Sequence, residues 1–363
     1  MKIALINDTL YPYHKGGAPK RVWKFAKGLL SAGHEPHIFS MNYKGTTYPV
    51  NENGVIIHGV CPVLPLYENY RRKISQALRY AWGLQWELGK WNLDAVYCTA
   101  FPVFPAFVAK DYCMDNNVPL ILDWYEFWEK SEWLEYLGRK GYIGYFLEKW
   151  AGYFTKWNIA DGDNVALKMR QHRVYVHKMI PDGVDVQGME LIDQPIKEYD
   201  VVYLGALLAH KNVELLINAC AKGNYSGLII GDGCRYNDLV NLAHELKANV
   251  DFAGSVYNDF HAFRNIKKAR VFVHPSLREG CGLTYVEAMA CKLPVVSVLN
   301  GNVVVDEYNG YICKNDVDDM VNKIRVALLN NGRLSEGAFN TAQKNDWSNS
   351  CIKLNKIIEE LVI

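Results

Sequence analysis

The chain has 363 residues, of which 50% are hydrophobic and 22% charged, and this composition excludes a disordered, collagen-like or low-complexity protein. At roughly 100 to 200 residues per domain, the length predicts two domains. The 40 Lys and Arg nearly balance the 39 Asp and Glu, so no global field indicates a nucleic-acid partner, and none is expected. The first 80 residues nevertheless carry 11 basic and 4 acidic side chains, which favours an anionic partner for the N-terminal part.

A short apolar run at 2–7 predicts a strand, and a glycine-containing loop then leads to a helical pattern over about 20–32. Gly33 is typical of a residue that ends such a helix, and residues 34–40 supply the next strand. This βαβ start is typical of a doubly wound sheet. Two further buried strands are predicted at 94–98 and 118–123.

Turn residues at 180–185, followed by a polar stretch, predict a domain boundary at Asp185. A second βαβ series starts at 200–205. Its later strands are predicted at 228–230, 250–253, 271–274 and 294–297. The expected domains are therefore 1–185 and 186–347, followed by an amphipathic helix over 348–363 that packs back on the N-terminal domain.

Nine cysteines form neither a CxxC pair nor a metal-ligand spacing with histidine, and their odd number argues against a disulfide framework. We therefore expect a reducing, cytoplasmic location. The N-terminus lacks the pattern of a secretory signal, and no apolar run reaches the roughly 18 residues of a membrane-spanning helix. The expectation is a protein that is soluble or lies peripherally on a membrane surface.

The most informative segment is 276–290, SLREGCGLTYVEAMA, which follows a predicted strand and leads into a predicted helix. Gly280 and Gly282 let backbone amides approach an anion, and the helix N-terminus adds about half a positive charge, which favours a diphosphate. Glu287, one turn into the helix, could accept hydrogen bonds from ribose hydroxyls. A structural alternative stays open, because Thr284-x-x-Glu287 is also a capping box. The glycine spacing is not the GxGxxG dinucleotide fingerprint.

Within this segment, Glu279-x7-Glu287 resembles the Glu-x7-Glu motif of retaining family 4 glycosyltransferases with the GT-B fold. Other segments are similar to that family in the expected order, namely KGGAPKRVW at 15–23, AGHEPHIFS at 32–40, IPDGVD at 180–185, HKN at 210–212, GDG at 231–233 and VDFAG at 250–254. The resemblance covers essentially the whole chain. It implies an α/β protein of two Rossmann-like, doubly wound domains facing across a cleft, the first binding the acceptor and the second the donor.

The implied activity is retaining transfer of a sugar from a UDP- or GDP-sugar to a hydroxyl of a glycan, glycolipid or other acceptor. Lys211 would contact the donor diphosphate and neutralise charge on the departing nucleotide. Glu279 would lie near the transferred sugar and Glu287 would hold the ribose, while Gly16 and Gly17 would form a loop that closes over the donor. The implied catalytic residues are Glu279, Lys211 and Tyr125, and the implied donor-binding residues are Gly16, Gly17, Gly205, Lys211, Gly231, Gly254, Arg278, Glu279, Gly280, Cys281, Gly282, Leu283, Thr284 and Glu287.

Retention in this family is usually described as front-face attack, in which the leaving phosphate helps to deprotonate the acceptor hydroxyl. The protein then mainly positions the substrates and stabilises charge, so no metal and no cofactor besides the nucleotide-sugar substrate is expected. Asp161-Gly162-Asp163 reads like a metal-binding DxD. It lies at the end of a predicted strand without other hard oxygen ligands nearby in sequence, so a metal role is not favoured.

The sequence departs from the family pattern at two positions. Ala206 stands where many members have an arginine, and Arg278 either supplies that charge or is a solvated loop residue. Tyr125 stands where some relatives have a histidine, and a tyrosine is a poor base at neutral pH because its reference pKa is about 10. These departures leave a catalytically degenerate GT-B scaffold or partner subunit as one alternative function. A nucleotide-sugar epimerase, which also has two Rossmann-like halves, is another.

Aromatic residues are dense between Trp124 and Trp157. Carbohydrate stacking, an acyl-chain groove, a membrane-interface patch and simple core packing all use such residues. A second segment resembles a basic, aromatic surface helix and contains Arg71, Arg72, Lys73, Arg79, Trp82, Trp86 and Trp91. With Lys15, Lys20, Arg21, Lys24 and Lys27 it could bind an anionic membrane surface, and a solvated helix face is the alternative. The hypothesis is a lipid-linked or membrane-proximal acceptor.

Overall fold

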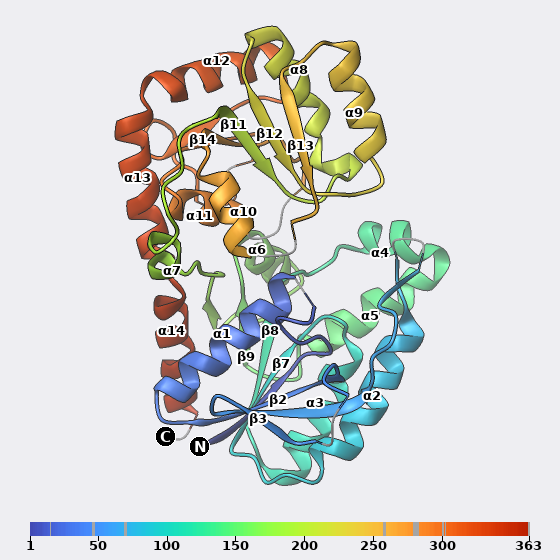
Figure 1. The fold of residues 1–363 in the computed structure, drawn as a ribbon. Helices are drawn as coiled ribbons and strands as arrows, with labels where there is room; N and C mark the ends of the chain where they lie inside the picture. Colours follow the sequence, from blue (N-terminus) through green and yellow to red (C-terminus); the bar gives the residue numbers. More distant parts are fainter. Residues whose placement is uncertain are drawn as a thin grey trace. The chain divides into compact units, whose positions relative to one another are not determined.

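The computed structural model describes residues 1–14, 16–45, 48–68, 71–256, 259–278, 283–299, 301 and 303–361. The chain divides into two compact units, each built on a mostly parallel sheet (Figure 1). The first unit comprises Met1–Asp182 and Ser348–Ile363, and the second comprises Gly183–Trp347. The first change of unit therefore comes three residues before the boundary expected at Asp185, and the second falls after Trp347.

The first unit contains an eight-stranded sheet, within the described residues, in the order β10-β9-β8-β7-β1-β2-β4-β3. All of its pairings are parallel except that of β3 with β4. Its strands are β1 (Lys2–Ile6), β2 (Glu35–Asn42), β3 (Val50–Glu52), β4 (Val55–Pro62), β7 (Ala95–Thr99), β8 (Leu120–Trp124), β9 (Trp157–Ala160) and β10 (Lys178–Met179), and β5 (Tyr67–Glu68) and β6 (Arg71–Arg72) form a separate hairpin. Strands β2 to β4 lie on one side of β1, and strands β7 to β10 lie on the other side. The strand order therefore reverses between β1 and β7.

The helices of the first unit are α1 (Gly17–Ser31), α2 (Ile74–Leu88), α3 (Phe104–Asn116), α4 (Lys130–Leu137), the short 3-10 helix η1 (Gly138–Lys140), α5 (Gly141–Ala151), α6 (Asp163–Gln171) and α14 (Trp347–Glu360). Neighbouring strand residues face opposite sides of the sheet. Val96 accordingly belongs to the core that includes Tyr80 of α2, while the Tyr97 ring packs against Phe25 of α1 at 5.8 Å.

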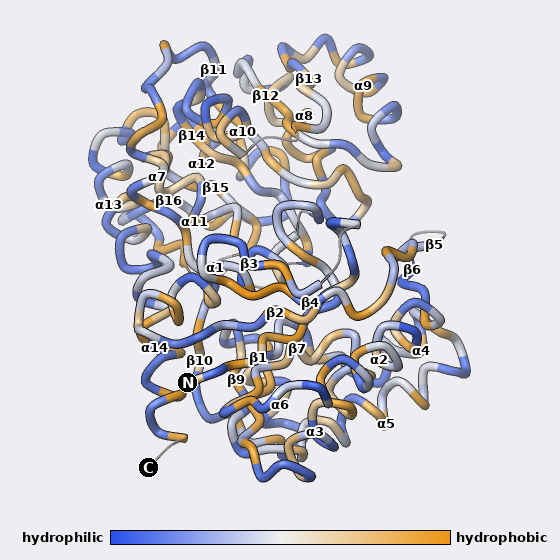
Figure 2. Tube along the Cα trace, turned by 60° about the horizontal axis from the view of Figure 1, so that its bottom comes forward, coloured by the Kyte–Doolittle hydropathy of each residue, from blue (hydrophilic) through white to orange (hydrophobic). Residues whose placement is uncertain are grey.

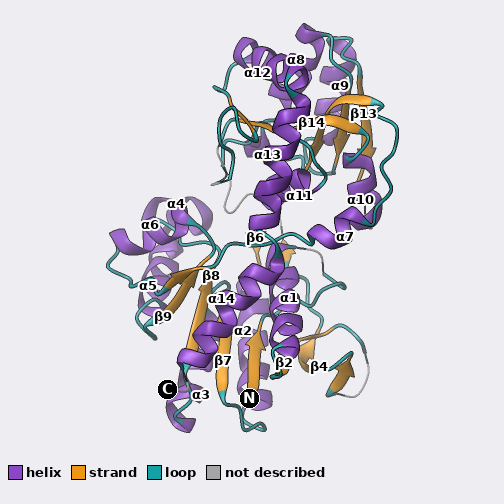
Figure 3. Cartoon of the chain, turned by 90° about the vertical axis from the view of Figure 1, so that its left-hand side faces the viewer, coloured by secondary structure: helices purple, strands orange, loops and turns teal. Residues whose placement is uncertain are grey.

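The last helix, α14, packs on α1 of the first unit (Figures 1 and 3). A Cβ atom at Gly28 of α1 would lie 2.4 Å from Sγ of Cys351, so this contact has no room for a side chain at Gly28. The Ser350 hydroxyl donates to the Pro181 carbonyl at 2.8 Å. The return of the chain to the first unit is therefore fixed by both packing and hydrogen bonding.

The second unit contains a six-stranded parallel sheet in the order β13-β12-β11-β14-β15-β16, again within the described residues. Its strands are β11 (Tyr199–Leu204), β12 (Gly227–Ile230), β13 (Val250–Gly254), β14 (Ala269–His274), β15 (Val295–Ser297) and β16 (Gly310–Ile312). The strand order reverses between β11 and β14. This is the order of a doubly wound, Rossmann-like sheet.

Helices cover both faces of this sheet (Figure 3). They are α7 (Val186–Glu190), the 3-10 helix η2 (Ala209–Lys211), α8 (Val213–Gly223), α9 (Tyr236–Glu245), α10 (Asp259–Ile266), α11 (Leu283–Ala290), α12 (Val317–Leu329) and α13 (Asn331–Lys344). Val201 belongs to the core that includes α8 and α12, while its neighbour Val202 belongs to the core that includes α11 and α13. Alternate residues of one buried strand thus build two cores.

The predicted α/β class with two doubly wound sheets is confirmed, and the predicted strands coincide with β1, β2, β7, β8 and β11 to β15. The apolar runs that identified them are visible along β1 and β2 (Figure 2). Gly33 follows α1 with φ +85°, as predicted for a helix end. The cysteines that the structure describes are free thiols. Among the described helices, none combines the length and the apolar character needed to cross a membrane.

Candidate functional site

In doubly wound sheets, ligands bind beyond the carboxyl ends of the strands, where the strand order reverses. In the second unit this place lies between the loops that follow β11 and β14. The first loop carries Lys211, and the second begins at Pro275 and leads toward α11. The topology therefore brings Lys211 and the segment before α11 to the same edge of the sheet.

Backbone and side-chain hydrogen bonds join these two loops directly. The Leu277 amide donates to the His210 carbonyl at 2.9 Å, and the Asn212 side-chain amide donates to the Pro275 carbonyl at 3.3 Å. Both neighbours of Lys211 are thus bonded to the loop that leads to α11. Lys211 itself is half-buried, and the next helix, α8, begins two residues later. A cation and a helix N-terminus therefore lie next to each other, which is a favourable setting for a phosphate.

Three of the implied donor-binding glycines meet at this same edge. The Gly231 amide donates to the Gly254 carbonyl at 2.9 Å. Gly231 has φ +147°, and a Cβ atom there would lie 1.9 Å from the Gly205 carbonyl oxygen. Gly254 has φ +65°, a region that favours glycine. The close approach of the Gly205 carbonyl to Gly231 and the positive φ of Gly254 therefore explain why both residues are glycines, whether or not a ligand is present.

Helix α11 carries the remaining described residues of the implied donor site. It begins at Leu283, so Thr284 lies inside the helix, and the capping-box alternative, which needs Thr284 before the first helical residue, is not what the structure has. Glu287 is in the second turn and is 6% exposed. Arg278 is exposed, and its carbonyl accepts a hydrogen bond from the Ser276 hydroxyl at 2.9 Å. The implied site residues Glu279, Gly280, Cys281 and Gly282, like Lys15 of the first unit, lie outside the described residues.

In the first unit, the equivalent reversal lies between β1 and β7. The Thr99 hydroxyl after β7 donates to Oδ1 of Asn7 after β1 at 3.1 Å, which joins the two loops. The β1 loop ends at Gly16 and Gly17, where α1 begins. A Cβ atom at Gly16 would come no nearer than 3.6 Å to another atom, and one at Gly17 no nearer than 3.8 Å. Packing within this unit therefore does not require glycine at either position.

A buried ionic cluster lies directly behind this loop. The Arg21 guanidinium of α1 donates to both carboxylate oxygens of Asp123 at 2.6 and 3.0 Å and to Oδ1 of Asp182 at 2.9 Å. Burial by itself lowers the pKa of Arg21, but Asp123 and Asp182 raise it, and the net result is a pKa well above the usual value. The expectation that Arg21 contributes to a lipid-binding face is wrong, because its side chain has no exposed area.

Tyr125 lies next to this cluster at the end of β8. Its hydroxyl is buried, and burial, followed by the nearby Asp123, raises its pKa well above the ordinary value. The hydroxyl is therefore protonated at neutral pH and suited only to donate or accept a hydrogen bond. Asp161 of the DxD-like segment is also buried, and burial followed by Asp182 raises its pKa. Among the residues that the structure describes, no group of three or more His, Cys, Asp and Glu side chains could hold a metal ion.

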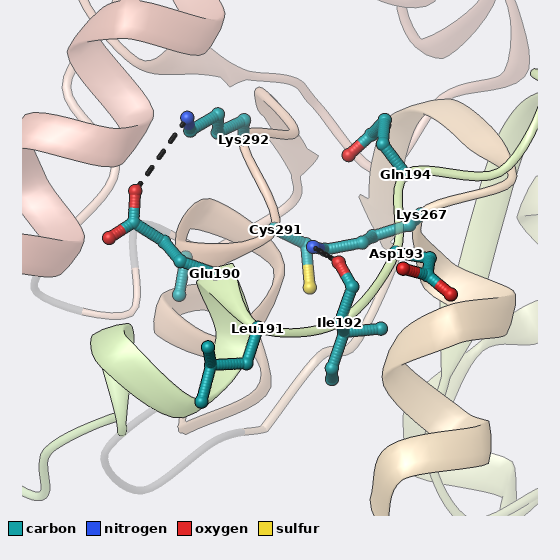
Figure 4. Close-up of a pocket in the computed structure, with 9 residues that line it drawn as sticks. Glu190, Leu191, Ile192, Asp193, Gln194, Lys267, Cys291 and Lys292 are labelled. Atoms are coloured by element: carbon teal, nitrogen blue, oxygen red, sulfur yellow. Dashed lines mark hydrogen bonds and ion pairs between the residues drawn. The ribbon is translucent and has the colours of Figure 1, made fainter.

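A cavity of about 430 Å³ in the second unit lies away from the switch point (Figure 4). It includes Ala290 and Cys291 at the carboxyl end of α11, whereas the implied donor site lies at the amino end of that helix. Of its two lysines, Lys267 donates to the carbonyls of Met189 at 2.8 Å and Ile192 at 2.6 Å. The Lys267 ammonium thus bonds the α7 turn to the end of α10. This cavity is not at the edge where doubly wound sheets bind ligands.

Two family models match the chain, one for each part. Residues 15–187 match the model described as Glycosyltransferase Family 4, and residues 192–345 match Glycosyl transferases group 1. Among curated relatives, the uncharacterized glycosyltransferase MJ1178 of Methanocaldococcus jannaschii is 30% identical over 44% of this chain and 48% of its own length. A GDP-mannose-dependent monoacylated α-(1-6)-phosphatidylinositol monomannoside mannosyltransferase of Corynebacterium glutamicum is 28% identical over 49% of this chain and 53% of its own. These matches span about half the length of each relative.

Solved structures share the whole fold. Sucrose-phosphate synthase from Thermosynechococcus elongatus has a TM-score of 0.81 at 19% identity, covering 99% of each chain. Anabaena Alr3699/HepE, solved in complex with UDP-glucose, has a TM-score of 0.73 at 15% identity and covers 99% of this chain and 100% of its own. These likenesses agree with two Rossmann-like units. Because the two models match successive parts of the chain and the curated relatives are glycosyltransferases, the chain belongs to the group 1 glycosyltransferases of family 4, with the GT-B fold.

Proposed function

We propose that this protein is a retaining glycosyltransferase that moves a sugar from a UDP- or GDP-sugar to a hydroxyl of a glycan, glycolipid or similar acceptor. The observation that carries the proposal is the anchoring of Lys211 at the switch point of the second unit. Both residues that flank Lys211 hydrogen-bond to the loop leading into α11. A nucleotide diphosphate bound at this edge contacts the Lys211 ammonium and lies at helix N-termini, both of which favour its negative charge.

In the proposed donor complex, Lys211 contacts the diphosphate and neutralises the charge that develops as the nucleotide leaves. The Glu287 carboxylate, in the second turn of α11, accepts hydrogen bonds from the ribose hydroxyls. Glu279 lies near the transferred sugar. Arg278 is an exposed cation close to this loop and supplies charge that Ala206, also exposed, does not.

We propose front-face transfer. The acceptor oxygen forms a bond to the anomeric carbon on the face from which the phosphate departs, and the carbon–oxygen bond to the phosphate breaks. The proton of the acceptor hydroxyl passes to the departing phosphate oxygen, and a nucleoside diphosphate leaves. The protein supplies orientation and charge stabilisation in this scheme and no covalent intermediate. Lys211 takes the part that a divalent ion takes in metal-dependent transfer, so we propose that the reaction needs no metal.

The names of similar proteins support both donor classes. The Corynebacterium relative uses GDP-mannose according to its name, and Alr3699/HepE was solved with UDP-glucose. The same Corynebacterium relative is named for a monoacylated phosphatidylinositol monomannoside, which supports a glycolipid among the acceptors. With free cysteines throughout the described chain, we place the protein in the cytoplasm, at the membrane surface when it meets such an acceptor.

The test is thermal unfolding of the purified protein with UDP, GDP, ADP and CMP. A ligand selective for the folded state stabilises it by RT ln(1 + [L]/Kd), about 2.7 kcal/mol at a hundredfold excess over Kd. We expect a shift with UDP or GDP that is lost in Lys211→Ala and Glu287→Ala. Lys222→Ala, at the other end of α8, is the matched control and keeps the shift. A folded protein that responds to none of the four nucleotides overturns the proposal in favour of a scaffold.

A further inference from the structure

An apolar cavity of about 260 Å³ lies in the first unit among α2, α4, α5 and the loop that follows β7. Its apolar wall includes Ile74 of α2, Phe101 and Pro102 of the loop, Trp133 of α4 and Ile143 of α5. Figures 1 and 2 show α2, α4 and α5 together on one side of this unit. The walls come from four separate segments, so the cavity is a product of the fold and not of one amphipathic helix.

The cavity has a basic end. Arg72 and Lys73 line it, and they also line a second, polar cavity of about 530 Å³ together with Glu68, Arg71 and Ser75. The two cavities therefore adjoin at Arg72 and Lys73. Lys140 adds an exposed cation to the apolar cavity. In the polar cavity Lys73 forms an ion pair with Glu68 at 3.4 Å, and the three cations still outnumber the one carboxylate. An apolar compartment beside such a net positive compartment is complementary to a molecule with an apolar chain and an anionic headgroup.

The position of the cavities ties them to the proposed reaction. Phe101 and Pro102 follow β7, one of the two strands at which the order of the sheet reverses. The Arg72 guanidinium forms an ion pair with Asp8, which follows β1, the other strand at the reversal. The polar cavity is thus bonded to the loop that ends at Gly16 and Gly17. Substrates of doubly wound sheets bind at this edge. A lipid that served only as a membrane anchor would not need to bind so close to it.

Exposed apolar side chains extend from the cavity along two helices. On α2 they follow a four-residue spacing from Ile74 through Leu78 and Trp82 to Trp86, and they are 43% to 69% exposed. On α5 they include Ile143 at 64% and Phe146 at 65% exposure. Ile74 and Ile143 belong both to these faces and to the cavity wall. Amphipathic helices with exposed tryptophans and flanking cations bind the interface of anionic membranes, so a chain can enter the cavity from a bilayer.

We infer that the acceptor is a phosphate-bearing lipid whose apolar chain lies in the cavity among α2, α4 and α5 and whose phosphate lies in the adjoining cavity of Arg71, Arg72 and Lys73. Naming this lipid as the acceptor rests on the proposed function. The binding of an alkyl or polyprenyl chain in the cavity does not depend on the proposed function. Glu148 preserves the cavity wall, because its carboxylate accepts a hydrogen bond from the Trp133 indole at 2.9 Å.

The first experiment measures binding of hexyl, octyl and decyl phosphate, below their micelle concentrations, to the full chain by titration calorimetry. Each buried methylene contributes about 0.8 kcal/mol, so affinity is expected to rise about fourfold per methylene until the cavity is filled. Alkyl glucosides of the same lengths test the headgroup, and weaker binding by about tenfold is expected for them. Affinity that does not depend on chain length, or that is equal for the two headgroups, overturns the inference.

Variants locate the binding. Ile143→Glu places a carboxylate in the wall at an exposed position and is expected to weaken decyl phosphate binding at least about tenfold. Arg71→Gln combined with Lys73→Gln, two of the cations that line the polar cavity, is expected to remove the preference for phosphate while the chain-length dependence remains. Met114→Glu on α3, 68% exposed and outside the wall, is the matched control and leaves binding unchanged. Equal affinity in Ile143→Glu and Met114→Glu overturns the cavity as the site.

A membrane patch without a lipid-binding cavity is a separate outcome. Binding to phosphatidylcholine vesicles with and without phosphatidylglycerol is compared in Leu78→Glu, which lies on the exposed face of α2 outside the wall. We expect Leu78→Glu to weaken vesicle binding and to leave decyl phosphate binding intact. If vesicle binding falls equally in Leu78→Glu and Ile143→Glu while no alkyl phosphate binds in solution, the surface is only a membrane contact and the inference fails.

The acceptor assignment is tested by transfer of label into a total lipid extract of the host organism, with labelled sugars carried by the nucleotide that stabilises the protein in the thermal test. We expect label in the organic phase, lowered about tenfold or more in Ile143→Glu with its nucleotide-induced thermal shift unchanged. Label confined to water-soluble glycans overturns the lipid acceptor. Alkyl phosphate binding as expected with no response to any nucleotide refutes the proposed function instead and leaves the lipid-binding cavity standing, so the two failures are distinguishable.

Discussion

Arg21 and Asp123 form a two-point ion pair in which neither side chain has any exposed area. Nε of Arg21 lies 2.6 Å from Oδ2 of Asp123, and Nη2 lies 3.0 Å from Oδ1. The two residues are 102 positions apart in the sequence and join α1 to β8. The pair holds the first turns of α1, and with them the loop that ends at Gly16 and Gly17, against the sheet.

Asp123→Asn is expected to destabilise the protein strongly, because it leaves the Arg21 guanidinium buried with one carboxylate in place of two. Removing one partner of a buried pair costs about 3 to 5 kcal/mol. Denaturant unfolding followed by circular dichroism measures this loss. The triple variant Arg21→Met, Asp123→Leu and Asp182→Leu is expected to lose less than Asp123→Asn alone, since it leaves none of the three buried charges behind. A larger loss in the triple variant contradicts this explanation.

Gly16→Ala is expected to leave the free energy of unfolding within about 0.5 kcal/mol of the wild type, because the fold has room for the methyl group. Transfer is expected to fall, because the methyl group would collide with the bound donor. Gly231→Ala is the contrasting variant. Its methyl group would lie 1.9 Å from the Gly205 carbonyl oxygen at φ +147°, so a loss of at least about 3 kcal/mol is expected. Thermal unfolding and a transfer assay separate the two effects. Full activity in Gly16→Ala would show that this loop does not close on the donor.

Tyr125→Phe is expected to lower transfer about tenfold or less and to leave the pH profile of kcat unchanged. The reason is that the Tyr125 hydroxyl is buried and its raised pKa prevents it from acting as a base near neutral pH. The assay is the rate of transfer between pH 6 and pH 9. A loss of a hundredfold or more, or a displaced pH profile, would show that this hydroxyl takes part in the chemistry.

Glu148 makes stability depend on pH. Burial raises its pKa from the ordinary 4.5 to about 7, while hydrogen bonds from Trp133 and Trp128 oppose the shift. A carboxyl whose pKa is higher in the folded state contributes stability that is fully present below about pH 4.5 and is lost as the pH rises through about 7. Relative to Glu148→Gln, the wild type is expected to lose about 3 kcal/mol between pH 4.5 and pH 8.

Urea unfolding of both proteins at these two pH values is the measurement for Glu148. The comparison with Glu148→Gln removes the contributions of other titrating groups, since these are shared by the two proteins. A difference in unfolding free energy that is the same at both pH values would show that the Glu148 carboxyl titrates normally in the folded protein.

Transfer is expected to survive removal of divalent ions, because Lys211 supplies the charge at the leaving group in the proposed reaction. The measurement is the rate of transfer after dialysis against EDTA, with and without added Mg²⁺ or Mn²⁺. Lys211→Ala is expected to lower the rate by about a hundredfold to a thousandfold. A rate that falls on dialysis and returns with Mn²⁺ would refute metal-independent transfer.

The sequence predicted the buried strands well, because parallel strands covered on both faces are continuous apolar runs such as 2–6 and 201–204. It did not predict β3, β5, β6, β10 or β16, since strands of two or three residues are too short to show a period. It also missed the eight-residue strand β4. The βαβ alternation of the residues indicated doubly wound sheets, but the order of the strands, and hence the two switch points, came only from the structure.

The candidate site was predicted unevenly for a related reason. Lys211 and Glu287 were identified by local segments that resemble a family. The pairing of Arg21 with Asp123 and Asp182 spans 102 and 161 positions, and a single sequence has no signal for such distances. Arg21 was therefore interpreted as one of five surface cations. The apolar cavity was equally hidden, because its wall joins four segments whose aromatic residues fit a core as well as a groove.

The way the chain enters and leaves the second unit has a topological consequence. The Val184 amide donates to the Asn345 carbonyl at 3.0 Å, and the Trp347 amide donates to the Val184 carbonyl at 3.1 Å. The two ends of the stretch 183–347 thus lie next to each other. The second unit is an insertion within the first unit, which continues along α14. For chimeras, the second unit can be exchanged as one uninterrupted piece with two neighbouring junctions, whereas the first must always be transferred as two pieces of chain.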